Sequence, residues 1–139
     1  MKSSGVLEHR FSFIIEGEGL PVEEIGGMVG LEPTKVIRQG DVINRLPEIV
    51  AEADEWVHTV DLSAPDGVDE RLNALLAALM AHKAQLDVIK AQWKASLRLY
   101  VQSDYAQIAY SLMPETLQKL VAVGLPLEVS TLSWGIVDL

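Results

Sequence analysis

The chain has 139 residues, with 20 acidic side chains against 11 Lys and Arg, and a formal net charge of −9. This length suits a single domain over 1–139, because domains most often contain about 100–150 residues. The acidic balance argues against nucleic-acid binding, which relies on basic side chains that contact phosphates. A hydrophobic content of 49% also excludes a disordered acidic tail.

The cysteine count and the length of the apolar stretches exclude further classes of protein. The chain contains no cysteine, which removes thiol catalysis, cysteine zinc sites and iron–sulfur clusters. No stretch approaches the roughly 20 consecutive apolar residues that span a bilayer, and the N-terminal residues lack the apolar core of a signal peptide. We therefore expect a cytoplasmic protein that has no membrane partner.

The N-terminal part reads as strand, helix, loop and strand. Alternating apolar side chains over residues 11–16 predict a strand. Pro21 suits the first turn of a helix, and Gly30 suits the left-handed residue that ends it. Residues 56–62 alternate again and predict the next strand.

The intervening segment, residues 31–54, shows no regular period and is interrupted by proline and glycine. Structureless stretches of this length are uncommon inside a compact domain and are usually functional. We expect a long loop here, with a short turn of helix near residues 47–53.

The C-terminal half alternates between helical and strand spacing. Leucines over residues 72–80 recur at i, i+3, i+4 and i+7 and predict a helix. The later predicted elements, in chain order, are a kinked helical extension through residues 86–93, a hairpin of strands 97–101 and 108–112 about Ser103-Asp104, a helix from Met113-Pro114 to Gly124, and a strand from Leu127 that Trp134 and Ile136 extend.

Two segments resemble each other in the proline and glycine residues that bound their predicted helices. Pro21 precedes Gly30 by nine residues and Pro114 precedes Gly124 by ten, each after an alternating strand. This favours a pseudo-repeated βαβ plan, with chance similarity of helix-boundary residues as the alternative. The sequence thus predicts an α+β fold, with a mixed, mainly antiparallel sheet, helices on one face, and a ferredoxin-like arrangement.

Residues with catalytic or metal-binding chemistry are few and scattered. His9, His58 and His82 fall on three different elements without metal-ligand spacing, so we expect no metal site and no cofactor. No Gly-x-Ser-x-Gly motif is present. Enzymatic activity therefore stays uncertain, and the residues favour a protein that is not an enzyme. The acidic clusters, Glu16 with Glu18 and Glu52 with Asp54 and Glu55, are typical of a solvated surface, and the alternative is acid–base chemistry or cation binding.

Five residues are candidates for contact with a ligand or partner. Arg38, Asp41 and Arg45 lie in the aperiodic segment, and Trp56 and His58 lie on the strand that follows. Arginine can hold a carboxylate or phosphate with two hydrogen bonds, and tryptophan often anchors interfaces. The alternatives are salt bridges for the arginines and burial in the core for the aromatic side chains.

Several short motifs appear in a recognisable order along the chain. They are Phe11-Ser12-Phe13-Ile14-Ile15, Leu20-Pro21, Gly30-Leu31-Glu32-Pro33-Thr34, Arg38-Gln39-Gly40-Asp41, Trp56, the leucine-rich helix, and Leu117 to Leu125. In this order the chain resembles the DUF4279 family, a bacterial domain of unknown function. The resemblance implies a small cytoplasmic protein without assigned catalytic residues, and an immunity-type role in which such a domain neutralises a toxin.

The acidic residues are concentrated in two runs. Glu16 to Glu32 contains five glutamates, and Glu48 to Glu70 contains eight acidic residues, with no Lys or Arg in either run. We expect a polarised surface that steers association with a basic protein partner.

Two functions follow from these observations. The first is a non-enzymatic binding module, an immunity-type inhibitor of a basic toxin, that acts through an acidic face and the loop of residues 33–54. The alternative is a small-ligand-binding or enzymatic domain with a pocket near Arg38, Trp56 and His58. Both a monomer and a homodimer stay open, because the apolar content is towards the high end for a small acidic domain.

Overall fold

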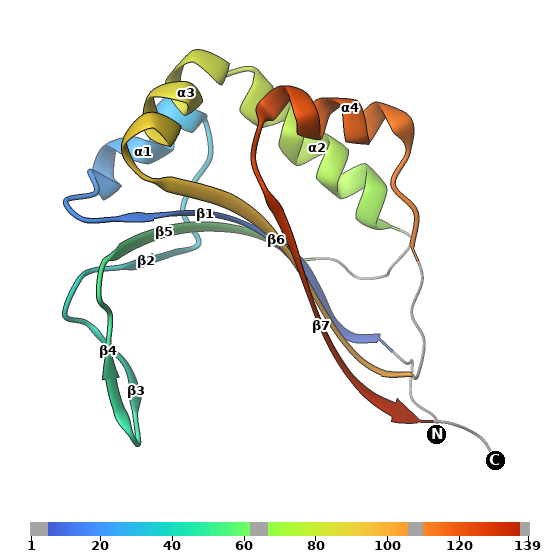
Figure 1. Cartoon of the computed structure of the whole chain (residues 1–139), viewed down its shortest axis with the longest axis horizontal. Coiled ribbons are helices and arrows are strands. Elements are labelled where there is room, and N and C mark those ends of the chain that lie inside the picture. Colours follow the sequence, from blue (N-terminus) through green and yellow to red (C-terminus); the bar gives the residue numbers. More distant parts are fainter. Residues whose placement is uncertain (1–5, 62–66, 106–109, 137–139) are drawn as a thin grey trace.

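A curved five-stranded sheet organises the molecule, as the computed structural model of residues 6–61, 67–105 and 110–136 shows (Figure 1). The strands follow the order β2-β5-β1-β6-β7, and each neighbouring pair is antiparallel except the parallel pair β6–β7. Their bounds are β1 Val6–Gly17, β2 Lys35–Ile37, β5 Asp54–Asp61, β6 Lys94–Tyr105 and β7 Leu127–Ile136.

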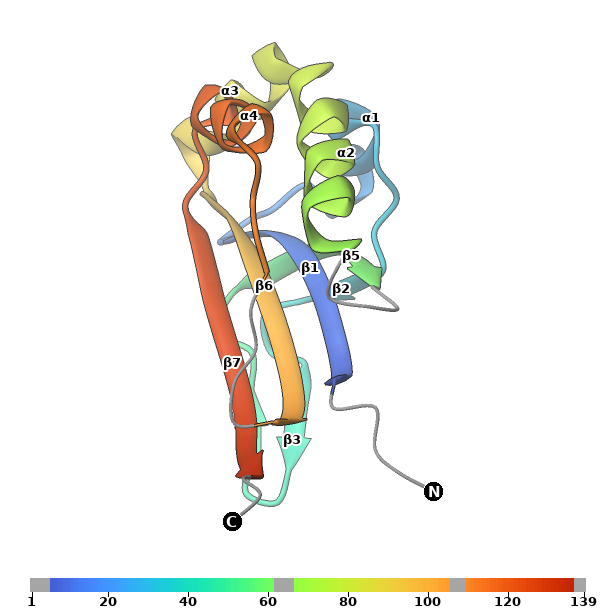
Figure 2. The same ribbon diagram turned by 90° about the vertical axis from the view of Figure 1, so that its right-hand side faces the viewer.

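Four helices in the described part of the chain cover one face of this sheet (Figure 2). They are α1 Val22–Val29, α2 Val68–Met80, α3 Lys83–Gln92 and α4 Pro114–Val123. The structure therefore confirms an α+β fold with a mixed, mainly antiparallel sheet and helices on one face. We call the other face of the sheet, which no described helix covers, the open face.

The period of two in β1 decides which side chains enter the core. Phe11, Phe13 and Ile15 are almost completely buried and belong to one apolar cluster with the leucines of α2. Successive side chains of a strand point to opposite faces, so Ser12 and Glu16 lie on the open face. Residues of β5 and β6 that pair with β1 point to the same face as their β1 partners, so these strands also have one core face and one open face.

The two strand–Pro–helix–Gly units differ in their geometry. In the first, α1 lies between β1 and β5 in sequence, and these two strands are antiparallel neighbours. In the second, α4 joins β6 to β7, and these neighbours are parallel. The ferredoxin-like repeat is therefore not confirmed, although both helices end as predicted, at left-handed Gly30 and Gly124.

The segment between α1 and β5 contains strands where a loop with a helical turn was predicted. After β2, the chain forms a separate hairpin of β3 (Val42–Arg45) and β4 (Glu48–Val50). The prediction of a helical turn near residues 47–53 was therefore wrong. Two short runs of β-branched residues, which favour strands, pair with each other across the turn at Leu46-Pro47.

The prediction of a hairpin between residues 97–101 and 108–112 is also wrong. A single strand, β6, continues through Ser103-Asp104 to Tyr105. Ile108 lies outside the described residues, whereas Tyr110 and Leu112 are described and are not in a strand. Strand β6 pairs with β1 on one side and with β7 on the other, and this double pairing overrides the local turn preference of Ser-Asp.

The predicted kinked extension of the leucine-rich helix is a separate helix. The chain breaks at Ala81-His82 between α2 and α3, and the backbone N–H of His82 donates to the Leu79 carbonyl at 3.0 Å. The imidazole of His82 then packs against Gly30, at the end of α1. This contact explains why residue 30 has no room for a side chain.

Substituting Gly30 by alanine tests that contact. Both Gly30 (φ 72°) and Gly124 (φ 73°) adopt the left-handed conformation, which costs an L-residue about 1–2 kcal/mol. A methyl group at Gly30 collides with the His82 ring, whereas one at Gly124 meets only the end of the flexible Lys90 side chain. We expect Gly30→Ala to lower the urea midpoint more than Gly124→Ala. Equal losses would show that His82 moves aside freely.

Candidate functional site

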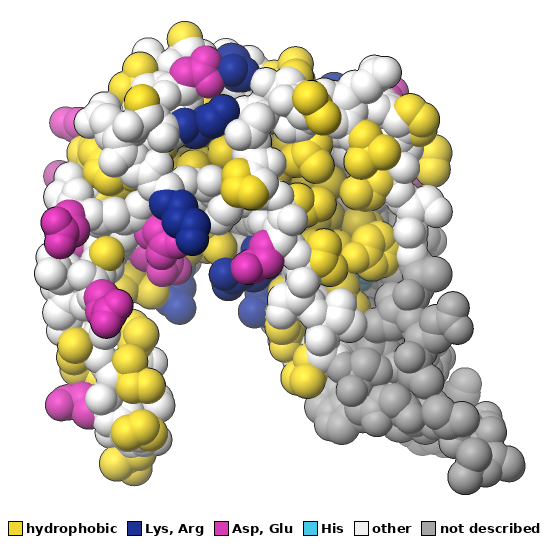
Figure 3. All heavy atoms as spheres, in the orientation of Figure 1, with side chains coloured by type: hydrophobic (Ala, Val, Ile, Leu, Met, Phe, Trp, Pro, Cys, Tyr) yellow, Lys and Arg dark blue, Asp and Glu magenta, His cyan; other side chains and the backbone are white. Residues whose placement is uncertain are grey.

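A cleft opens between the β3–β4 hairpin and the open face of the sheet. The hairpin projects from the β2–β5 end, away from the helices, and Figure 3 shows the molecule hollowed beside it. The cavity here has a volume of about 370 Å³. We call it the hairpin cleft; its lining residues are Glu16, Ile37, Ile43, Ile49, Val50, Ala51, Glu52, Ala53 and Glu55.

Backbone hydrogen bonds fix the hairpin at its base. The Gly40 N–H donates to the Ala51 carbonyl at 2.9 Å, and the Ala51 N–H donates to the Asp41 carbonyl at 2.8 Å. Asp41 also closes the preceding turn, because its Oδ2 accepts a 2.7 Å hydrogen bond from the Arg38 N–H. A lone two-stranded hairpin is marginally stable in water, so these bonds hold the wall of the cleft in place.

Asp54 joins this base to the rest of the fold. Its Oδ1 accepts a hydrogen bond from the Gln39 N–H at 2.9 Å, and its Oδ2 accepts one from the Leu20 N–H at 3.0 Å. The hydrogen bond from Gln39, followed by that from Leu20 and the charge of Arg38, lowers the pKa of Asp54 against the opposing effect of desolvation. Sequence reasoning placed Asp54 in a solvated acidic cluster, but its side chain is buried and structural.

Three carboxylates and an apolar wall give the cleft its chemistry. Glu16 of β1 lies directly opposite Glu55 of β5 in the antiparallel register, an arrangement that is destabilising for like charges. Lys94 of β6 lies opposite Glu16 on the other side, and its Nζ is 3.5 Å from Glu16 Oε1. With three carboxylates and one lysine beside them, the site is complementary to a further positive charge.

The apolar part of the cleft comes mainly from the hairpin, with Ile37 of β2 beside it. Ile43 and Ile49 are 54% and 45% exposed, which is high for isoleucine. At the tip, Leu46 is 91% exposed. Exposed apolar side chains grouped in this way mark binding surfaces, because a folded chain otherwise buries them.

The five predicted candidates do not lie in the hairpin cleft. Arg38 and Asp41 form the turn at the hairpin base, and Arg45 lies in β3 next to the tip. Trp56 is completely buried and packs edge-to-face on Phe13, with ring centroids 5.9 Å apart. None of the five belongs to the lining of the hairpin cleft.

His58 has a structural role in the described part of the fold. Its Nδ1 lies 2.6 Å from the Glu32 carbonyl, so it connects β5 to the loop that follows α1. Glu32 also lines a second cavity, of about 410 Å³, beside the end of α1. Arg38, Trp56 and His58 are absent from the lining of this cavity as well, so neither cavity is the pocket that was expected near these three residues.

The sequence identified the acidic clusters of the hairpin cleft but not that they meet in one site. Glu16 belongs to the first acidic run, and Glu52 and Glu55 belong to the second. Only the pairing of β1 with β5 brings the two runs together. A usable signal was the pair of β-branched runs, Val42-Ile43 and Ile49-Val50, about the proline-containing turn.

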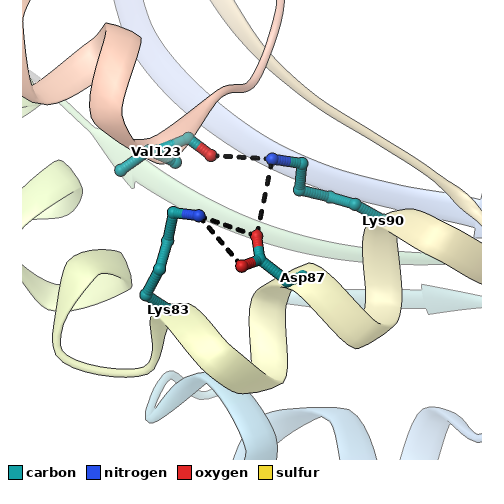
Figure 4. A network of polar contacts seen from close by, with 4 residues as sticks. All are labelled: Lys83, Asp87, Lys90 and Val123. Carbon is teal, nitrogen blue, oxygen red and sulfur yellow. Dashed lines mark hydrogen bonds and ion pairs between the residues drawn. The ribbon is translucent and has the colours of Figure 1, made fainter.

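Another polar cluster connects α3 to the end of α4 (Figure 4). The Lys83 Nζ donates to both carboxylate oxygens of Asp87, at 2.8 and 3.0 Å, and this interaction lowers the pKa of Asp87. The Lys90 Nζ lies 3.7 Å from Asp87 Oδ1 and donates to the Val123 carbonyl at 3.0 Å. A cation at a helix C-terminus is favourable, so this cluster stabilises helix packing.

The described residues hold neither a metal-binding cluster nor a membrane-spanning helix. No group of three or more His, Asp or Glu side chains among them is placed to share a metal ion. Within the same ranges, no helix combines the length and apolar character needed to cross a membrane.

Comparison with known proteins identifies the family. The model for the domain of unknown function DUF4279 matches residues 8–134, which is nearly the whole chain. No curated protein and no solved structure matches the chain. The order of motifs noted in the sequence and this match agree, and the chain belongs to the DUF4279 family.

Proposed function

We propose that this domain is a non-enzymatic binding module that takes a basic, partly apolar segment of a partner protein into the hairpin cleft. More specifically, we propose that the domain is an immunity-type inhibitor that blocks a basic toxin in this way. The observation that carries the proposal is the unusual opposition of Glu16 and Glu55 beside an exposed apolar wall.

Charge complementarity supports a basic occupant. The cleft presents Glu16, Glu52 and Glu55, and the ion pair of Glu16 with Lys94 balances only part of this charge. A Lys or Arg of the partner placed between Glu16 and Glu55 relieves their mutual repulsion. The net charge of −9 adds long-range attraction, which raises association rates.

The composition of the cleft suits a basic, partly apolar ligand. Its lining contains only Glu, Ile, Val and Ala side chains. Carboxylates hold cations and aliphatic side chains hold apolar groups, and the three glutamates are the only groups of this lining with acid, base or nucleophilic chemistry. The exposed isoleucines fit an apolar residue next to the partner's basic side chain.

Charge reversal in the cleft tests this function. The probe is a fluorescein-labelled ten-residue peptide of alternating Lys and Leu, whose binding is measured by fluorescence anisotropy. We expect the double variant Glu52→Lys with Glu55→Lys to weaken binding about tenfold or more, because two attractions become repulsions.

The matched control is Glu24→Lys with Glu70→Lys, two exposed helix residues outside the cleft. Both double variants change the net charge from −9 to −5, since each substitution removes one negative charge and adds one positive charge. The control is expected to keep most of the affinity. Equal weakening by the two double variants would show that only overall charge matters and would overturn the cleft as the site.

A further inference from the structure

The two edges of the sheet differ in how well they are protected. Edge strand β2 has three residues, one of which is Lys35, and ends in the turn at Arg38. Edge strand β7 has ten residues, and Glu128 is its only charged residue; it contains no lysine and no proline. Short length, lysine and proline are the usual devices that prevent edge pairing, and β7 has none of them.

The backbone groups of β7 that pair with no other described strand can be assigned from its pairing with β6. The Leu97 N–H donates to the Pro126 carbonyl at 2.9 Å, so the even-numbered residues of β7 point their backbone groups toward β6. In a strand, alternate residues direct their N–H and C=O groups to opposite sides. Leu127, Val129 and Thr131 therefore present their backbone donors and acceptors at the outer edge.

An antiparallel pair of two β7 strands about a two-fold axis fits this edge. With Val129 opposite Val129 of the second copy, Leu127 pairs with Thr131 and Glu128 lies opposite Ser130. Shifting this register by one residue to place Glu128 opposite itself is disfavoured by like-charge repulsion. Within each copy, Arg98 Nε lies 2.6 Å from Glu128 Oε1, so the edge carries little net charge.

Helix α4 supplies an apolar surface on the same side of the molecule. Leu117 and Val121 of α4 and Met113, the residue before the helix, recur at every fourth position, and Val121 is 79% exposed. The opposite flank of α4 contacts α2, because Asn73 Nδ2 donates to Thr116 Oγ1 at 3.1 Å. At about 100° per residue, Leu117 and Val121 point away from α2.

The figures place helix α4 and the β7 edge on the same side of the molecule. In Figure 2, α4 lies over the β6–β7 side of the sheet, and α2 lies over the β1–β5 side. Figure 3 shows hydrophobic side chains on the face of the molecule that carries α4 and β7. A strand pair alone gives a small interface, and the α4 stripe adds the second layer that a stable contact of about 800 Å² per partner needs.

We propose that the β7 edge, together with the Met113–Leu117–Val121 stripe of α4, is the interface of a two-fold homodimer. The two sheets join through antiparallel β7 strands into one continuous sheet. An axis perpendicular to the sheet keeps both α4 helices on the same face, where their apolar stripes meet. The hairpin cleft lies at the opposite end of each sheet, so it stays accessible in the dimer.

Sedimentation equilibrium of the wild-type protein and two edge variants tests the interface. At about 100 µM we expect the wild type to show twice the mass of the chain, an affinity within the range of ordinary specific contacts. Val129→Lys places two like charges opposite each other at the axis, and we expect it to weaken dimerisation at least about tenfold. Val36→Lys is the matched control, since Val36 is a similarly exposed valine on edge strand β2.

Cysteine pairing tests the register without relying on a disruptive variant. The chain has no cysteine of its own. Residues opposite each other in a hydrogen-bonded antiparallel pair have Cα atoms about 5.5 Å apart, within disulfide range. We expect Val129→Cys to form a disulfide-linked dimer on oxidation and Val36→Cys to stay monomeric on a non-reducing gel.

Three outcomes would overturn the proposal. They are a monomeric wild type at about 100 µM, a dimer that Val129→Lys leaves intact, and cross-linking through Val36→Cys in preference to Val129→Cys. Added salt separates this interface from the hairpin cleft. Screening reduces repulsion between two acidic copies and strengthens the dimer, whereas it weakens binding of the basic peptide.

Discussion

Replacing Trp56 by alanine is expected to lower the free energy of unfolding by about 3–5 kcal/mol, the range for deleting a large buried aromatic side chain. Trp56 is completely buried and packs edge-to-face on Phe13. Domains of this kind are stable by about 5–15 kcal/mol, so the variant loses a large part of its stability. Urea unfolding followed by circular dichroism measures the loss, since tryptophan fluorescence changes with the substitution itself.

Phenylalanine at the same position separates packing from polarity. The indole Nε1 of Trp56 has no hydrogen-bond partner among the described residues, so Trp56→Phe removes a buried unsatisfied donor together with part of the side-chain volume. We expect a loss less than half that of Trp56→Ala, with binding of the basic peptide unchanged. A variant that folds normally but loses peptide binding would contradict the assignment of Trp56 to the core.

Replacing Asp54 by asparagine is expected to loosen the base of the hairpin. One carboxylate serves two backbone donors, the N–H groups of Leu20 and Gln39, and an amide has only one oxygen to accept them. We expect a melting temperature lower by about 5 °C and weaker peptide binding, because one wall of the cleft is no longer fixed. Differential scanning calorimetry and fluorescence anisotropy measure the two effects.

The loss of stability at acid pH tests the role of Asp54 independently. Its pKa in the folded protein is lowered from the ordinary value of 3.8, so its contribution to stability is complete above that value and is lost as the pH falls through the folded-state pKa. We expect Asp54→Asn to remove part of the acid destabilisation of the wild type. Asp41→Asn is the control, because Asp41 is exposed and accepts one local N–H. A larger loss in Asp41→Asn would contradict the central role of Asp54.

The strong helices and strands were predictable because their signals are local. The alternation in β1 and β5 and the leucine spacing in α2 reflect one buried face on each element. Gly30 and Gly124 end their helices as expected, because the left-handed conformation suits glycine. These residues also predicted the α+β class, since a half-buried strand and an amphipathic helix need each other as cover.

The errors came from segments whose structure depends on distant partners. Strand β6 continues through Ser103-Asp104 because strands on both sides pair with it. The β-branched runs within residues 42–50 are a local signal for the hairpin strands, but the contacts of Asp54 and of the Ala51 backbone that fix the base of the hairpin have no signal there. The structural role of Asp54 was missed for the same reason.

The sequence by itself determined that the chain is acidic and folded, that its fold is α+β, and that its acidic residues form two runs. Only the tertiary structure decided where those runs meet: the pairing of β1 with β5 sets Glu16 opposite Glu55, and the hairpin provides the apolar wall beside them. Local periodicity records which face of an element is buried, but it does not record which elements become neighbours. Charge convergence is a property of that neighbourhood, because electrostatic energy depends on distance in space.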